Sequence, residues 1–255
     1  MSPRDHGCVL VAVAHGSAHP RARDTVGELM AVVRERAATL DLRTAYLCHA
    51  LPSLPQVMAA IEPDRPVTVI PLLLTAAYHS KTDIPRMLAG FPGHQVSYGA
   101  PLGPHPLLLR ALERRLAQSG PRVLGDSART GVVLAAAGSS DPGANASIAR
   151  LAAQWQARSG WFAVRPAYAS AASPDPGVAV NALLRDGARR VVVATYLLAP
   201  GYFADQIRDS SLAAGAAAVS PVLGASAEVA DVLLDRFRAL NITGRELSSA
   251  PACLT

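Results

Sequence analysis

The sequence is short of several features that would assign it to common classes of protein. It has no apolar run approaching the roughly 18–20 residues that a membrane-spanning helix needs. Only one of its 24 basic residues, Lys81, is a lysine, and neither a basic run nor an interleaving of basic and aromatic residues is present. These absences argue against a membrane protein and against a protein that binds nucleic acid.

Cysteine and aromatic residues are also scarce. The three cysteines, Cys8, Cys48 and Cys253, are an odd and scattered set, which argues against a disulfide framework and fits a reducing compartment. Aromatic residues make up only 5% of the chain, so its cores must be built from Val, Leu, Ile and Ala. The apolar stretch at 9–14 runs into His15 instead of a small-residue cleavage site, so we expect a buried strand there and a cytoplasmic protein.

What the chain does have is a globular composition, with 50% hydrophobic residues, and an internal repeat. The segment at 9–17 is echoed at 132–139 with an offset of 122 residues, and 67–78 is echoed at 191–202 with an offset of 124. The pattern predicts two copies of one unit, at 1–120 and 130–243, with 244–255 as a flexible tail. Single positions that match at the first offset are Tyr46 and Tyr168, Ala50 and Ala172, and Pro52 and Pro174.

Each copy reads as alternating strands and helices. The runs at 9–14 and 67–74 are continuously apolar and rich in β-branched residues, which is typical of strands buried on both faces. The segments at 25–39 and 107–117 carry apolar residues at helical spacing. We therefore predict an α/β protein of two similar doubly wound lobes, each a four-stranded parallel sheet flanked by helices, with ligands bound beyond the carboxyl ends of the strands.

Histidine and cysteine gather at those strand ends in the first copy. His15 ends the first strand, Cys48 and His49 follow a second strand at 42–47, and His79 follows the third. His105 follows a fourth strand at 96–100. All seven histidines lie before residue 106; in the second copy Ala137, Ser170 and Phe203 stand where the first has His15, Cys48 and His79.

Two interpretations of these residues follow from spacing alone. Neutral imidazoles that converge on one sheet edge are common ligands of late first-row divalent metals. Single histidines after strands can equally be ordinary polar loop residues. Gly16 and Ser17 would supply a bend and a helix N-cap whose positive helix end could attract an anionic ligand, or Ser17 is only a cap.

Three motifs resemble those of the class II, ATP-independent chelatases, in particular the sirohydrochlorin chelatase group. They read HGSxxPRA at 15–22, PLLLTAxYHxxxDIP at 71–85 and PLGPHP at 101–106, with a weaker match at 52–54. The resemblance implies two α/β lobes facing across a cleft, here in one duplicated chain that we expect to be a monomer. It implies insertion of Fe²⁺, our first choice, or Co²⁺ into sirohydrochlorin in siroheme or cobalamin biosynthesis, with His15 and His79 as the metal-binding and proton-accepting pair.

The chain departs from the family pattern at Cys48, where relatives commonly carry a glutamate. A thiolate is a softer ligand than a carboxylate and could change the preference for the metal, or Cys48 could be a buried bystander. Its neighbour His49 should point to the opposite side if the strand extends that far, which would make it a poor substitute ligand.

The implied substrate has eight carboxylates, so a basic rim would favour its binding. Near the motifs, Tyr78 and the segment at 73–77 could line the face of the ring, and Tyr202 with Phe203 could close the cleft from the second lobe. The candidate partners of the carboxylates are Arg21, Arg23, Lys81 and Arg86, and Ser17 and His105 are further candidate substrate-binding residues.

We expect no cofactor beyond the metal substrate and no nucleotide, because Lys81 and Thr82 lack the glycines of a phosphate-binding loop and no GxGxxG follows a strand. Two other functions remain open on the sequence. One is a metallochaperone or tetrapyrrole carrier that binds without catalysis. The other is a two-lobed binding protein of the periplasmic type, against which the lack of a signal peptide speaks.

Overall fold

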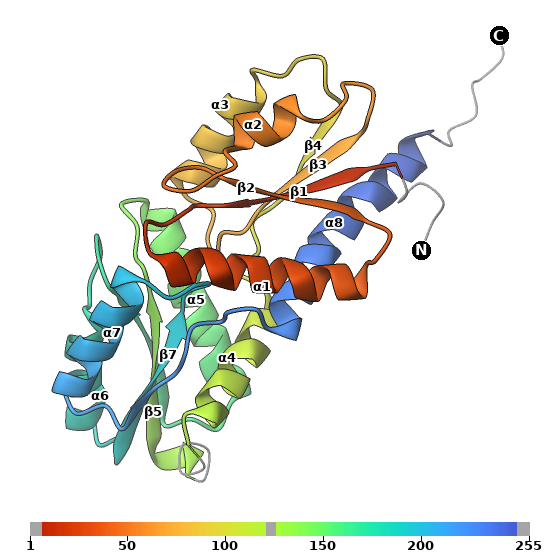
Figure 1. Ribbon diagram of the computed structural model, residues 1–255. Coiled ribbons are helices and arrows are strands. Elements are labelled where there is room, and N and C mark those ends of the chain that lie inside the picture. The colour runs from red at the N-terminus through yellow and green to blue at the C-terminus, as the bar shows by residue number, and fades with distance from the viewer. Residues whose placement is uncertain (1–6, 121–125, 249–255) are drawn as a thin grey trace.

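A computed structural model describes residues 7–120 and 126–248, and it contains two sheets of four parallel strands (Figure 1). The strand orders, β2-β1-β3-β4 and β6-β5-β7-β8, are the same in both lobes. The predicted fold class and the internal duplication are therefore confirmed. The strands are β1 Val9–Ala14, β2 Asp41–Tyr46, β3 Val67–Pro71, β4 Val96–Tyr98, β5 Thr130–Ala136, β6 Ala163–Tyr168, β7 Arg190–Tyr196 and β8 Ala218–Val219.

The helices follow the strands as βαβ connections demand. Four of them begin at a proline, whose fixed φ suits the first helical turn and whose missing N–H is not needed there. The helices are α1 Pro20–Arg36, α2 Leu54–Ala59, the π-helix His79–Asp83, α3 Ile84–Leu88, α4 Pro106–Gln118, a 3₁₀ turn Ser127–Arg129, α5 Pro142–Arg158, α6 Pro176–Arg185, α7 Tyr202–Ala213 and α8 Ala227–Ser248.

Several predicted boundaries need correction. The helix expected at 25–39 begins earlier, at Pro20, and ends at Arg36. The strand expected at 67–74 stops at Pro71, because its pairing with β1 ends there and the chain then turns toward the space between the lobes. The tail expected at 244–255 is helical up to residue 248, and the rest of it lies outside the described residues, as do residues 121–125 between the two copies.

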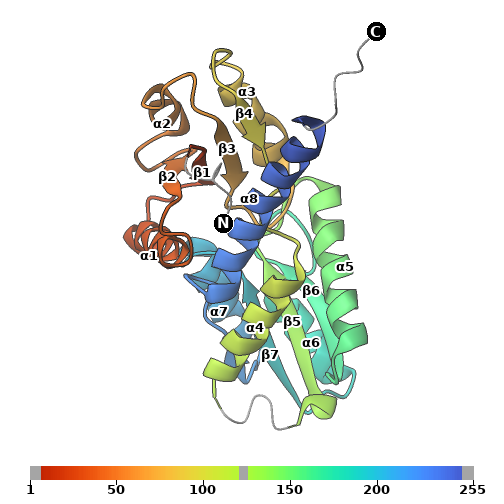
Figure 2. The ribbon, with the colours of Figure 1, turned by 90° about the vertical axis from the view of Figure 1, so that its right-hand side faces the viewer.

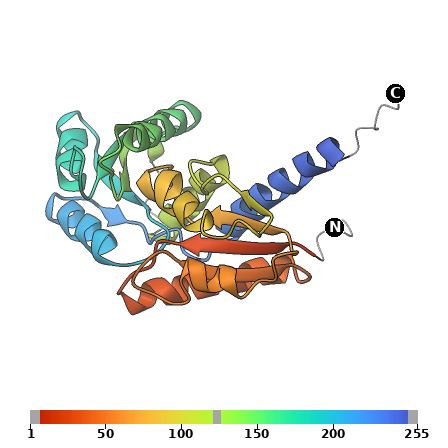
Figure 3. The same ribbon diagram turned by 90° about the horizontal axis from the view of Figure 1, so that it is seen from above.

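The two lobes exchange their last helices. Helix α4 follows β4 of the first lobe but packs against β7 of the second, and α8 follows β8 of the second lobe but packs against β3 and α1 of the first. Figure 2 shows α4 and α8 crossing side by side, and in Figure 3 α8 runs from the second lobe along the first sheet. One continuous buried core therefore includes Leu10 of β1, Leu112 of α4, Val192 of β7 and Leu233 of α8.

This exchange fixes the two sheets relative to each other. Arg115 of α4 donates to the carbonyl of Leu223, and Arg236 of α8 donates to the carbonyl of Pro101. Each sequence repeat therefore contributes its last helix to the lobe formed by the other repeat. Among the described residues, no helix is both long enough and apolar enough to cross a membrane.

Candidate active site

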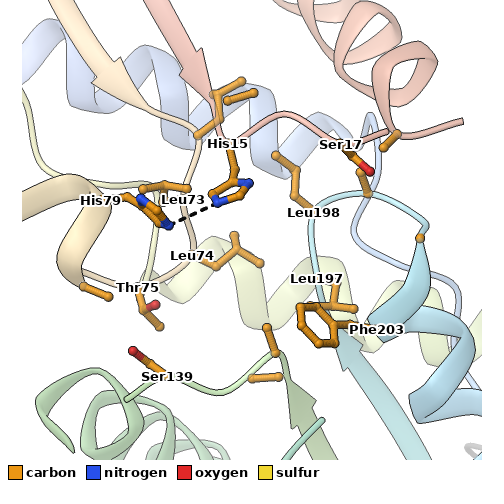
Figure 4. Close-up of a pocket in the computed structure, with 18 of the residues that line it drawn as sticks. His15, Ser17, Leu73, Leu74, Thr75, His79, Ser139, Leu197, Leu198 and Phe203 are labelled. Carbon is orange, nitrogen blue, oxygen red and sulfur yellow. Dashed lines mark hydrogen bonds between the residues drawn. The ribbon is translucent and has the colours of Figure 1, made fainter. Parts of the chain in front are cut away.

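A cavity of about 880 Å³ lies between the lobes, beyond the carboxyl ends of β1, β3, β5 and β7. This is the place where ligands bind in open parallel sheets, and the volume suits a small organic molecule. Most of its wall is apolar, with Leu73 and Leu74 from one lobe facing Leu197 and Leu198 from the other (Figure 4).

His15 and His79 meet at the wall formed by the first lobe. Their Nε2 atoms are 3.1 Å apart and their rings stand edge to face, with centroids 4.6 Å apart (Figure 4). His15 follows directly on β1, and His79 is the first residue of the π-helix after β3. The parallel sheet therefore brings together two imidazoles that are 64 positions apart in the chain.

Gly16 allows the loops after β1 and β2 to approach closely. Its φ is +89°, and a Cβ at this position would lie 1.7 Å from the carbonyl oxygen of Cys48. The main-chain N–H of Cys48 donates to the carbonyl of His15 over 3.0 Å, which continues the β1–β2 pairing past the strand ends. The loop that carries His15 is thus held by main-chain contacts that only glycine permits.

Cys48 contacts His15 but is not among the residues that line the cavity. Its thiol donates to the His15 carbonyl over 3.1 Å, and Sγ lies 3.6 Å from His15 Nδ1. Burial raises the pKa of Cys48, which favours the protonated thiol over the thiolate that binds metals. Among the described residues, no group of three or more His, Cys, Asp or Glu side chains is arranged to hold a metal ion.

His49 lines the cavity, because the strand does not extend far enough to turn its side chain away. The strand β2 ends at Tyr46, and His49 has a φ of +56° in the left-handed region. The alternation of side chains along a strand therefore no longer applies at this position. The backbone turn brings His49, rather than Cys48, to the cavity wall.

The candidate basic residues separate into two groups. Among the described residues that line the cavity, Arg23 alone carries a positive charge. Arg21 lies 3.4 Å from the ring of His19, Arg86 sits in α3 outside the lining, and Lys81 forms a 2.6 Å ion pair with Asp141 of the second lobe. Neither Lys81 nor Arg86 reaches the cavity wall.

Ser17 lines the cavity but does not cap α1. Its Oγ accepts the N–H of His19 over 3.0 Å, and His19 occupies the N-cap position because Pro20 starts the helix. The expected N-cap at Ser17 is therefore wrong. The loop between β1 and α1 therefore runs from His15 to His19.

Exposed aromatic side chains stand on both sides of the cavity. Tyr78 is 60% exposed and Tyr202 is 76% exposed, and both line the opening together with Phe203. The two tyrosines occupy equivalent positions in the repeat, at the start of the helical turn that follows the third strand of each lobe. A flat apolar ligand in the cavity would find an aromatic residue at each side.

His105 does not line the cavity. It is the N-cap of α4, and its Nδ1 accepts the main-chain N–H of Leu107 over 3.3 Å. Burial, and then the charge of Arg236, lower the pKa of His105. The structure therefore gives this residue a role in starting the exchanged helix, in place of contact with a ligand in the cavity.

The His105 cap predicts an acid-sensitive fold. Below the ordinary histidine pKa of 6.5 the unfolded chain binds a proton that the folded His105 resists, so stability should fall as the pH drops through this value. Protonation also removes the acceptor at Nδ1, a cap of about 1 kcal/mol. Urea unfolding at pH 7.5 and pH 5 should show that the free energy of unfolding falls less in His105→Asn than in the original protein, because asparagine caps a helix without titrating. Equal decreases in the two proteins would contradict this role.

Asp83 was quoted in the second motif but was not assigned a role from the sequence. Its Oδ2 lies 2.6 Å from Nδ1 of His79, on the side of the ring away from His15. The signal that could have found it is the spacing His-x-x-x-Asp, which places both side chains on one side of a helical turn. Carboxylates commonly orient histidines that bind metals.

The second lobe repeats the architecture of the site without its imidazoles. Gly138 has a φ of +86°, and a Cβ there would lie 1.9 Å from the carbonyl of Ser170, as at Gly16. In place of a histidine pair, Ser139 and Asn145 form hydrogen bonds with each other's polar groups at the cavity wall. The histidine chemistry is confined to one lobe, and the other contributes a wall.

Comparison with known proteins also divides the chain into two repeats. The sequence profile of the CbiX family matches residues 9–119 and 131–240. The chain is 26% identical to the sirohydrochlorin cobaltochelatase of Priestia megaterium over 204 residues, which are 77% of this chain and 66% of that protein. It is 27% identical to the sirohydrochlorin ferrochelatase of the same organism over 214 residues, covering 80% and 78%.

The fold has solved counterparts. The structure described as SirB from Bacillus subtilis with Fe³⁺ superimposes with a TM-score of 0.78 at 22% identity, covering 94% of this chain and 97% of that one. At this identity the superposition supports the fold alone, whereas the profile match spans both repeats. The chain therefore belongs to the CbiX family, and it carries that family's unit twice.

Proposed function

We propose that this protein inserts a divalent metal, Fe²⁺ in the first place or Co²⁺, into sirohydrochlorin without hydrolysis of a nucleotide. The observation that carries the proposal is the pair of Nε2 atoms, 3.1 Å apart, of His15 and His79 at the wall of a cavity of about 880 Å³. The names of the relatives, which include both cobaltochelatases and ferrochelatases, supply the substrate class and leave the metal open.

The reaction exchanges two pyrrole N–H protons for one M²⁺ ion. Two imidazole nitrogens bound to one tetrahedral metal at about 2.1 Å lie about 3.4 Å apart, close to the separation of the histidine pair. Imidazole near neutral pH both ligates metals and accepts protons. In our proposal His15 and His79 deliver the metal to the ring and accept the protons that it displaces.

The cavity supports the binding of a flat, polyanionic ring. Its apolar walls would cover the macrocycle, and Tyr78 and Tyr202 would contact its rim from the two lobes. Among the described residues that line the cavity, Arg23 carries the positive charge, so we assign it to a substrate carboxylate. Lys81, previously a candidate for the same role, instead joins the two lobes next to the site through Asp141.

Arg23→Ala should raise the KM for sirohydrochlorin about 5–10-fold and leave kcat within about twofold. An exposed charge-assisted hydrogen bond contributes about 1 kcal/mol to binding, and this carboxylate lies away from the reacting nitrogens. Arg21→Ala is the matched control, because Arg21 lies in the same helical turn and does not line the cavity. Equal KM values in the two variants would remove Arg23 from the site.

The proposed function is tested by turnover. Sirohydrochlorin and Co²⁺ or Fe²⁺ are mixed without nucleotide under anaerobic conditions, and the absorbance of the ring is followed with substoichiometric protein. We expect many turnovers per protein molecule, and competition between the two metals identifies the preferred one. Binding of metal or ring with no acceleration over the spontaneous reaction would instead identify a metallochaperone or a carrier.

A further inference from the structure

We propose that Asp83 is a positioning residue that fixes the tautomer and orientation of His79, so that its Nε2 faces the metal as an acceptor. The inference rests on the proposed function only in taking His79 as a metal ligand. The contact that carries it is the 2.6 Å hydrogen bond between His79 Nδ1 and Asp83 Oδ2. Asp83 is the less exposed partner, with 26% of its side chain exposed against 44% for His79.

The chemistry of the two groups decides which nitrogen carries the proton. An ionised carboxylate can only accept, so Nδ1 of His79 must donate, and a neutral ring then has its lone pair on Nε2. The opposite tautomer would place the Nδ1 lone pair 2.6 Å from a carboxylate oxygen, where the two repel. Asp83 therefore selects the form of His79 that can bind a metal through Nε2.

His15 has a matching acceptor. Its Nδ1 lies 3.0 Å from the carbonyl oxygen of Gly16, which also can only accept. If both Nδ1 atoms donate, neither neutral ring has a proton on Nε2, so the 3.1 Å hydrogen bond between the two Nε2 atoms needs either one additional proton or a cation in its place. Two neutral rings arranged in this way repel each other, whereas a cation between them is favourable. Asp83 thus takes part in preparing a site for a positive ion.

The π-helix His79–Asp83 holds the carboxylate of Asp83 next to the ring of His79. Its wide turn is closed by the hydrogen bond from the N–H of Ile84 to the carbonyl of His79, and the side chain of Ile84 is fully buried. The hydroxyl of Tyr98 donates to the carbonyl of Ser80 over 2.7 Å. His79 and Asp83 are therefore the two ends of one anchored turn, and π-turns of this kind are frequent at functional sites.

The second repeat supports the pairing independently. At the offset of 124 residues, His79 corresponds to Phe203 and Asp83 corresponds to Ile207, which is fully buried. The position equivalent to Tyr78 keeps its tyrosine, Tyr202. The histidine and its acid are thus absent together from the lobe that has no imidazoles, as expected if the carboxylate serves the ring and not the fold.

The test measures Co²⁺ binding without tetrapyrrole, by the visible absorption of the bound ion. Asp83→Asn can offer its amide N–H₂ to Nδ1 and so favours the Nε2–H tautomer. We expect its Co²⁺ affinity to fall about 10–100-fold, the usual effect of losing such a carboxylate, with partial recovery in Asp83→Glu. The matched control is Asp24→Asn, which removes the same charge from the exposed surface of α1 and should bind Co²⁺ like the original protein.

A second measurement needs no variant. In ¹H–¹⁵N spectra of the original protein, the neutral form of His79 should show the Nδ1–H tautomer. The Nε2–H tautomer, or unchanged Co²⁺ affinity in a folded Asp83→Asn protein, would overturn the proposal, and the tautomer result decides it if the variant does not fold. Failure of the proposed function gives a different pattern: Co²⁺ binding that depends on Asp83, with no turnover of sirohydrochlorin in the original protein.

Discussion

Replacing His79 with alanine should lower the rate of metal insertion by about 100-fold or more, a loss of about 2.7 kcal/mol in transition-state stabilisation. The same loss is expected for His15→Ala. Each ring supplies one of the two nitrogens that lie 3.1 Å apart, so either substitution leaves the metal with a single imidazole of the pair. Initial rates of sirohydrochlorin metallation, at saturating ring and metal, measure the effect.

His94→Gln is the matched control for the loss of an imidazole. The Nε2 atom of His94 bonds to the carbonyl of Ile61 over 3.0 Å, far from the cavity lining, and glutamine can keep that hydrogen bond. We expect its rate to stay within about twofold of the original. Rates like the original in both His15→Ala and His79→Ala would rule out the pair as the reaction centre, and His49, which also lines the cavity, would then become the first candidate.

Gly16→Ala should destabilise the protein by about 3 kcal/mol or more, which is a large fraction of the stability of an ordinary domain. The new Cβ would lie 1.7 Å from the main-chain oxygen of Cys48, and the φ of +89° is strained for alanine. Because the obstacle is main chain, the loops after β1 and β2 must separate. Urea unfolding monitored by circular dichroism measures the loss, and the displaced His15 should also reduce Co²⁺ binding.

The chain contains a matched control for this substitution. Gly27 lies within α1, is exposed, and a Cβ there would meet nothing within 4 Å. Gly27→Ala should stabilise the protein by up to about 1 kcal/mol, since alanine is the better helix former. If Gly16→Ala costs no more stability than Gly27→Ala, the close contact between the two loops is not a constraint on the fold.

Local sequence pattern was sufficient for the architecture. Continuous apolar runs such as Val9–Ala14 identified buried strands, and the recurrence of whole segments identified the duplication. Because parallel strands end at one edge, His15 and His79 could be placed together from their positions alone. Apolar periodicity does not fix the boundaries, because Pro20 begins α1 ahead of the periodic segment and the length of β3 depends on its partner β1.

Charge and residue type did not reveal the partners of individual side chains. Lys81 was expected at the substrate, yet it pairs with Asp141, 60 positions away in the other lobe. Whether Cys48 or His49 lines the cavity was open on the sequence, and the positive φ at His49 places His49 there. Such outcomes depend on backbone angles and on neighbours distant in the chain, which no local pattern encodes.

The two α/β lobes, the strand ends that carry histidine and the confinement of histidine to one lobe can all be predicted from the chain's pattern of residues. These features depend on periodicity and on repetition along the chain. The exchange of α4 and α8 between the lobes is seen only in the folded chain, because it depends on which sheet lies beside each helix in space. The folded chain also shows the Nδ1 atom of His79 bonded to Asp83 within the π-helix, whose following residue, Ile84, is buried in the core.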